Sequence, residues 1–198
     1  MKKKVMTDIQ VKLLIAALVT LALISIGAEG MSKLNLQSNN ENQEQRELLT
    51  IVRDKQLLER DPERVAKAIE RLGEIRSIAA INDLVDLLTF KRIFEWDSER
   101  NGIIDEPHFI SITGRYPAAG ALFQIGKPAL PALIKVIGTE KTGSLAGENA
   151  IYTVTQIFRD SPAEGVSYLK DAAANASSAQ AARRLSYAAE RVKRFHQQ

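Results

Sequence analysis

The chain has 198 residues, with 27 Lys and Arg, 24 Asp and Glu, two His and no Cys. This length suits one domain or two small ones. The lack of Cys excludes disulfide frameworks, thiolate zinc sites, cysteine nucleophiles and cysteine lipidation, and two His are too few for a His-rich metal cage. The net charge of +3 raises the question of nucleic-acid binding, so the position of that charge matters.

The N-terminus has the parts of an export signal. Four Lys within the first 12 residues precede an uncharged apolar run over residues 13–28, and small residues follow it. A positive start, an apolar middle and a small-residue end are typical of a secretory signal peptide. The run is short for a membrane span of about 20 residues, although bilayer thinning or tilt would let it act as an anchor. We predict that residues 1–30 are either a cleaved signal peptide or an inner-membrane anchor, so that the rest is periplasmic or extracellular.

This segment also accounts for most of the basic charge. Residues 1–30 hold four Lys and two acids, which leaves a net charge of +1 for the remainder. We therefore expect no nucleic-acid partner, and membrane contact only through the N-terminal segment. Residues 31–46 are rich in Asn and Gln and are predicted to be a flexible tether. The folded domain is predicted over residues 47–198, with a first helix at about 44–59.

Helix pairs follow, beginning at Asp61-Pro62, where Asp suits the position before a helix and Pro its first turn. Gly73 is predicted to end this helix in the left-handed conformation. Its apolar stripe comprises Val65, Ala68, Ile69 and Leu72, and a second stripe comprises Ala80, Ile81, Leu84, Val85 and Leu88.

The same pattern recurs further along the chain. Ala121, Leu122, Ile125 and Gly126 repeat Ala68, Ile69, Leu72 and Gly73 at an offset of 53 residues. Ala129, Leu130, Leu133, Ile134 and Ile137 repeat the second stripe at an offset of 49 residues. A weaker third copy covers residues 150–169. A last helix, at about 178–195, has an apolar side of Ala182, Leu185, Ala189, Val192 and Phe195 and an Arg-rich side, which suits the end of a repeat array.

Residues 118–137, AAGALFQIGKPALPALIKVI, resemble the HEAT family of α-helical repeats. The marks are a small-Leu-x-x-Ile-Gly helix end and a Pro-Ala-Leu-Pro-x-Leu-Ile start to the next helix. Residues 68–88 are a looser match. The predicted fold is therefore all-α: a short right-handed α-solenoid of HEAT-like helix pairs with one inserted loop or small hairpin. An irregular helical bundle is the alternative. The resemblance implies that the second helices line the concave side, where the partner-binding candidates are Asn82, Asp83, Asp86 and Lys135.

An insertion over residues 91–113 separates the first two pairs and exceeds the usual helix connection of about 2–8 residues. Insertions in repeat proteins often lie on the binding face. In one interpretation, Asn101-Gly102 forms the turn of a hairpin that caps the repeats. In another, Trp96 projects to a partner.

A third interpretation is a cation site. Asp97, Glu99, Asn101 and Asp105 have the spacing of an EF-hand calcium loop, in which oxygen ligands alternate. His108 stands at the twelfth position, where the pattern requires a bidentate Glu.

The sequence contains no Gly-rich phosphate loop, G-x-S-x-G elbow or H-E-x-x-H motif. We therefore predict no enzyme activity and no cofactor. The expected function is an extracytoplasmic interaction or scaffold module for a protein or peptide. One alternative is a calcium-stabilised envelope module that uses residues 97–108. A less favoured one is a hydrolase that uses the acidic insertion with His108.

Overall fold

The computed structural model describes residues 42–93 and 112–195. These residues form helices, turns and irregular segments, with no β-strand among them, so the described part of the chain is all-α as predicted. The chain divides into two compact units, residues 1–44 and 45–198. Helices α2 to α11 (residues 55–195) all belong to the second unit.

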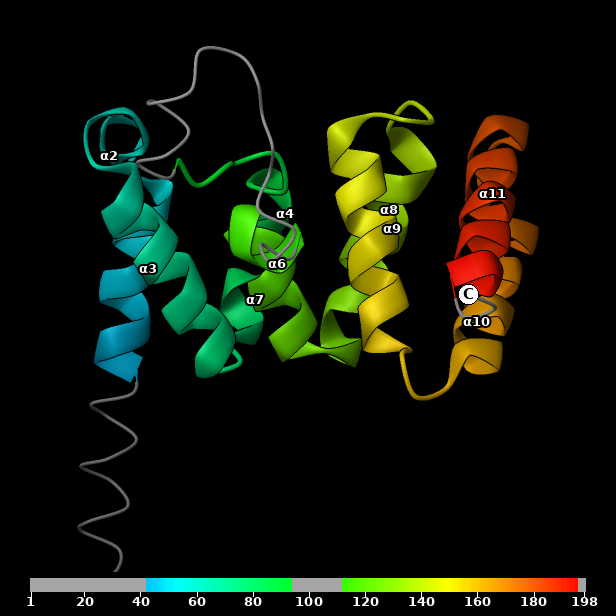
Figure 1. Cartoon of the computed structure of the whole chain (residues 1–198), viewed down its shortest axis with the longest axis horizontal. Helices are drawn as coiled ribbons and strands as arrows, with labels where there is room; N and C mark the ends of the chain where they lie inside the picture. Colours follow the sequence, from blue (N-terminus) through cyan, green and yellow to red (C-terminus); the bar gives the residue numbers. More distant parts are fainter. Residues whose placement is uncertain (1–41, 94–111, 196–198) are drawn as a thin grey trace, which may run out of the picture. The chain divides into compact units, whose positions relative to one another are not determined.

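Residues 42–53 are helical, including residues 42–46 that were predicted to be tether. The α-helices that follow are α2 (Lys55–Arg60), α3 (Pro62–Glu74), α4 (Ile81–Asp86), α6 (Ile112–Arg115), α7 (Pro117–Ile125), α8 (Leu130–Thr139), α9 (Leu145–Ile157), α10 (Pro162–Ala174) and α11 (Ala179–Phe195). Short 3₁₀ turns, Ile78–Ala80 and Lys127–Ala129, precede α4 and α8. In Figure 1, α2 and α3 lie at one side of the view, α4, α6 and α7 overlap next to them, and α8 with α9 and then α10 with α11 follow towards the other side.

Side-chain caps mark two early helix starts. The Oδ1 of Asp54 accepts hydrogen bonds from the backbone N–H groups of Gln56 and Leu57, at 2.9 and 3.3 Å. The single helix predicted over 44–59 is therefore wrong, because Asp54 breaks it and begins α2. Asp61 caps α3 through the N–H of Arg64 at 3.1 Å, which confirms the predicted start.

Gly73 does not have the role that the sequence suggested. It lies within α3, and the residue with a positive φ after this helix is Arg76, at 50°. Gly73 is buried instead against α7, where an added Cβ would lie 2.6 Å from the Cα of Ala121. Gly126 differs, because it ends α7 with φ 79° and ψ −142°, a region that is open essentially to glycine alone.

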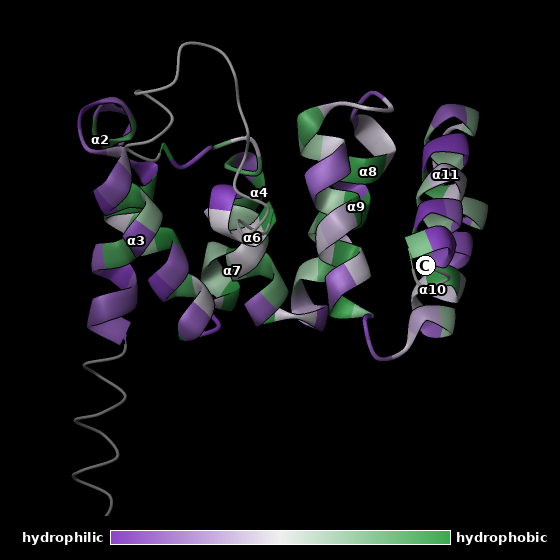
Figure 2. Ribbon diagram, in the orientation of Figure 1, coloured by the Kyte–Doolittle hydropathy of each residue, from purple (hydrophilic) through white to green (hydrophobic). Residues whose placement is uncertain are grey.

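The predicted apolar stripes form one core. Buried side chains from every predicted stripe belong to it, and the equivalent residues Val85 and Ile134 are both only partly buried. α3 packs on α7, α7 on α9, and α9 on α11, while α4 contacts α8. Figure 2 shows hydrophobic and hydrophilic sides on individual helices, such as α3 and α11. Phe195 departs from its predicted place in the buried stripe, since it is 50% exposed.

The two ends of the insertion are joined by Arg92. Its backbone N–H donates to the carbonyl oxygen of Arg115 at 2.9 Å. Its guanidinium donates to Glu70 at 2.7 and 2.9 Å and to Glu63 at 3.0 Å. The hydrogen bond to Glu70 is the main cause of the raised pKa of Arg92, so this group stays charged. Arg92 therefore fixes both flanks of the insertion to α3.

Replacing residues 94–111 by a Gly-Ser linker of about six residues should leave the fold intact. The flanking contacts of Arg92 remain, and loop length changes the free energy of unfolding by only about 1 kcal/mol here. Arg92→Ala in the same linker variant removes the guanidinium contacts with Glu70 and Glu63 as well and should lower the melting temperature clearly. Thermal unfolding followed by circular dichroism compares the two, and equal losses would contradict the role given to Arg92.

Candidate binding surface

The residues predicted to bind a partner on the second helices lie at or near the surface. Asn82 and Asp86 on α4 and Lys135 on α8 are exposed. The Asp83 carboxylate accepts from Nε and Nη2 of Arg53, at 2.8 and 3.0 Å, and so joins α4 to the helical segment over residues 42–53. These hydrogen bonds raise the pKa of Arg53.

The predicted insertion residues cannot be placed. Trp96, the candidate cation ligands Asp97, Glu99, Asn101 and Asp105, and His108 all lie outside the described residues. The calcium site stays a prediction, which a calcium-dependent rise in melting temperature that is lost in Asp97→Ala would test. Within the two described ranges, no group of three or more His, Asp or Glu is placed to hold a metal ion.

A cleft lies between α9 and α11. Arg191 Nη2 lies 3.3 Å from Glu148 Oε2, and the rings of Tyr152 and Phe195 meet edge to face with centroids 6.5 Å apart. These contacts step four residues along each helix in the same direction, so α9 and α11 run parallel here. The cleft holds about 200 Å³ and is lined by Ile112, Glu148, Asn149, Ile151, Tyr152, Thr155, Arg191 and Phe195. We call it the α9–α11 cleft.

The amphipathic pattern of α11 places its residues at this cleft. Its buried stripe consists of Leu185, Ala188, Ala189 and Val192. Beside that stripe, Arg184, Tyr187, Arg191 and Arg194 recur at the three- and four-residue spacing of one helix face. A second, open depression is lined by Tyr187, Arg191, Arg194 and Phe195, and it adjoins the α9–α11 cleft through the shared residues Arg191 and Phe195.

Arg191 is held at the cleft rim by two side chains. Its Nη1 donates to the Tyr187 hydroxyl at 2.9 Å, and its guanidinium carbon lies 5.8 Å from the centroid of the Tyr187 ring. The hydrogen bond to Tyr187, with the nearby charge of Glu148, raises the pKa of Arg191 despite its desolvation. Burial raises the pKa of the Tyr152 hydroxyl, which therefore stays neutral at pH 7. The α9–α11 cleft thus combines aromatic walls with a fixed positive charge.

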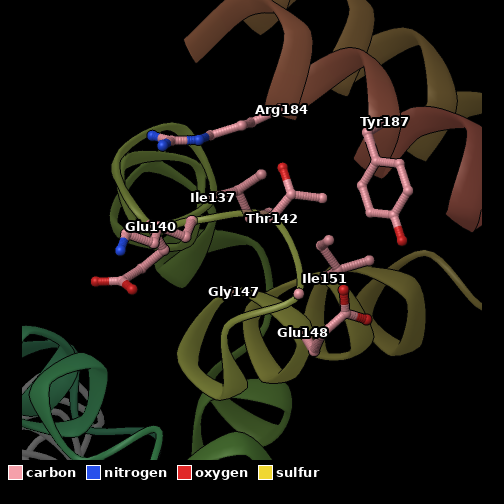
Figure 3. A pocket seen from close by; sticks show the side chains of 10 residues that line it. Ile137, Glu140, Thr142, Gly147, Glu148, Ile151, Arg184 and Tyr187 are labelled. Atoms are coloured by element: carbon pink, nitrogen blue, oxygen red, sulfur yellow. The ribbon is translucent and has the colours of Figure 1, made fainter. Parts of the chain in front are cut away.

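A third depression lies between α11 and the loop that joins α8 to α9. Figure 3 shows Tyr187 extending from α11 beside Ile151 and Glu148, and Arg184 on the same helix. Its free volume of about 10 Å³ is at the lower limit for one water molecule. The region is therefore a closely packed helix interface, which holds α11 against α8 and α9.

Arg184→Ala should lower the free energy of unfolding by about 1 kcal/mol. Arg184 Nη1 donates to the carbonyl oxygens of Gly138 and Thr139, at 2.9 and 2.7 Å. These hydrogen bonds give a partner to carbonyl groups at the C-terminal end of α8, which have none within the helix. Arg183→Ala is the matched control. Arg183 is exposed, and its replacement removes the same charge from the same helix. Urea unfolding measures both, and an equal loss in the two variants would contradict this capping role.

Sequence periodicity identified the Arg-rich side of α11 but missed the cleft beside it. Tyr152 and Tyr187 stand at helical positions, where the sequence alone indicates packing residues rather than a binding site. The available signal was Tyr187 and Arg191 at i and i+4, a spacing that brings two side chains together on a helix. Their juxtaposition with α9 depends on how the two helices meet, which periodicity does not define.

No known protein family, curated protein or solved structure matches this chain. Among the helices of the described residues, no single one is long and apolar enough to cross a membrane, and only the bent pair Pro117–Ile125 and Lys127–Thr139 passes that test together.

Proposed function

We propose that this chain is an exported, non-catalytic interaction module, built from HEAT-like helix pairs, that binds a protein partner. The observation that carries the proposal is the α9–α11 cleft. It presents Tyr152, Phe195 and a fixed Arg191 around an open depression of about 200 Å³. Aromatic residues and Arg are the residue types enriched at the centres of protein interfaces.

The order of helix contacts supports a repeat array. The first helices of successive pairs are neighbours, from α3 to α7, from α7 to α9, and from α9 to α11. The second helices α4 and α8 also contact each other. Contacts between adjacent repeats are what hold an α-solenoid together. Export is proposed from the pattern of residues 1–30, which lie outside the described ranges.

A photo-crosslinking residue in place of Phe195, compared with one in place of Lys135, tests the module in intact cells. Phe195 lines the α9–α11 cleft, whereas Lys135 is exposed on the second helix α8. We expect a discrete covalent adduct to one protein from position 195 and little from position 135. An adduct from position 135 alone would support the interaction module but place its binding surface on the second helices. No adduct from either position would contradict the proposed function.

A further inference from the structure

We infer that the α9–α11 cleft binds an acidic peptide segment that carries a large aromatic or aliphatic side chain. This inference rests on the proposed function and names the chemistry of the partner. The large side chain would enter the depression beside Tyr152 and Phe195, and the acidic side chains would meet Arg191 and Arg194 at its rim.

The charge of α11 selects an acidic partner. This helix carries five cationic residues, Arg183, Arg184, Arg191, Lys193 and Arg194, and one acid, Glu190. Two of the cations, Arg191 and Arg194, line the open depression beside the cleft. Glu148, the acid that lines the cleft, already pairs with Arg191 at 3.3 Å. Because a planar guanidinium matches a carboxylate geometrically, the rim suits Asp and Glu side chains.

The Arg191 guanidinium is also preorganised. Tyr187 and Glu148 hold it from two sides, so binding would cost little of the side-chain entropy that a mobile surface Arg loses. A guanidinium has five N–H donors, and the contacts to Tyr187 and Glu148 leave capacity for a further acceptor.

The shape of the cleft favours a peptide over a membrane or a nucleic acid. A depression of about 200 Å³ accommodates an inserted side chain, which a flat bilayer surface does not supply. Ile112, which is 40% exposed, adds apolar surface to the lining. The chain after residue 30 has a net charge of only +1, which is too small for a general phosphate-binding surface.

Fluorescence anisotropy with the full-length protein and a labelled 12-residue probe tests this inference. The probe contains one Trp flanked by Glu, and two further probes replace Glu by Lys or Trp by Ser. We expect the Glu–Trp probe to bind at low salt and each altered probe to bind at least about tenfold more weakly. Affinity should fall as salt is raised, because exposed charges are screened.

Paired variants locate the binding. Arg191→Gln with Arg194→Gln should weaken binding of the Glu–Trp probe by about tenfold or more. Arg183→Gln with Lys193→Gln removes the same charge from α11 at two exposed positions that do not line the cleft, and should change affinity by less than about threefold. Circular dichroism checks that each variant is folded. If the first pair unfolds the protein, Arg191→Lys with Arg194→Lys replaces it, and binding should still weaken because the planar forks are lost.

Several outcomes would overturn the inference. Equal losses in the two variant pairs would show a nonspecific charge effect. Tighter binding to phosphatidylglycerol vesicles than to the Glu–Trp probe, with the same dependence on Arg191 and Arg194, would assign the surface to a membrane. Absence of probe binding together with a crosslinked adduct from position 195 would overturn the acidic chemistry and leave the proposed function standing. Probe binding without any adduct in cells would instead count against the proposed function.

Discussion

Replacing Gly73 with Ala should lower the free energy of unfolding by about 2 kcal/mol or more. The new Cβ would lie 2.6 Å from the Cα of Ala121 and 2.9 Å from its Cβ. The first of these is a backbone atom, so no side-chain rotation relieves the overlap and α3 must move away from α7. This movement would open the core between α3 and α7, to which the fully buried Leu72 and Leu122 belong. The gain of about 1 kcal/mol in helix propensity from Gly to Ala offsets only part of the cost.

Gly138→Ala is the matched control for this substitution. Gly138 lies in α8, and its added Cβ would be 3.6 Å from the Cβ of Ala181, an ordinary contact distance. We expect an unchanged stability or a gain of up to about 1 kcal/mol, because Ala favours the helix. Urea unfolding of both variants measures the difference. A Gly73→Ala protein as stable as the wild type would show that α3 and α7 are not in close contact.

Gly73 also shows what sequence reasoning could not resolve. A Gly at the end of an apolar stripe indicates either a left-handed turn or the close approach of another element, and both explanations fit the same letters. Gly126 at the equivalent repeat position has the positive φ, whereas Gly73 makes the close approach. The difference arises from the packing of α3 on α7, which involves residues 48 positions apart.

Burial within helices was predictable because it depends on local periodicity. The three-residue spacing of Ile69 and Leu72 in α3, and of Leu122 and Ile125 in α7, places each of them on the inner side of its helix, and all four are buried. Asp61-Pro62 was predictable for the same local reason, since a cap involves neighbours in the chain.

Contacts between distant helices were not predictable in this way. The α9–α11 cleft depends on Glu148 meeting Arg191 and on Tyr152 meeting Phe195, each pair 43 residues apart. A shift of α11 by one turn along α9 would keep every buried stripe and remove both contacts. The periodicity of each helix therefore predicts its buried face but not its register against a neighbour, and the candidate site depends on that register.

Phe158→Ala should lower the free energy of unfolding by about 3–5 kcal/mol, which is a large share of the total for an ordinary domain. Phe158 is 1% exposed at the end of α9, and its ring lies 5.9 Å from the ring of Tyr168 in α10. Lys127 Nζ lies 5.7 Å from the centroid of the same ring. Gly165 allows α10 to approach, since a Cβ there would lie 2.8 Å from that of Phe158. Removing the ring leaves a cavity where α9, α10 and the turn before α8 meet.

Phe123→Ala provides a control with the same chemical change. Phe123 lies on α7 and is 40% exposed, so its loss should cost about 1 kcal/mol after the gain in helix propensity. Thermal unfolding by circular dichroism compares the two variants. Similar losses would contradict the central packing role assigned to Phe158.

The distribution of the Phe158→Ala effect also distinguishes the two fold hypotheses. In a solenoid, stability comes from interfaces between neighbouring repeats, so loss of Phe158 should increase amide hydrogen exchange mainly in α10 and α11. Amides of α3 have no direct contact with the altered site and should keep most of their protection. An equal loss of protection in α3 and α10 would mean that the helices unfold as one cooperative unit, which is the behaviour of a single bundle. Because α9 and α11 form the candidate cleft, the solenoid outcome also predicts that Phe158→Ala weakens binding of the acidic probe while α3 stays folded.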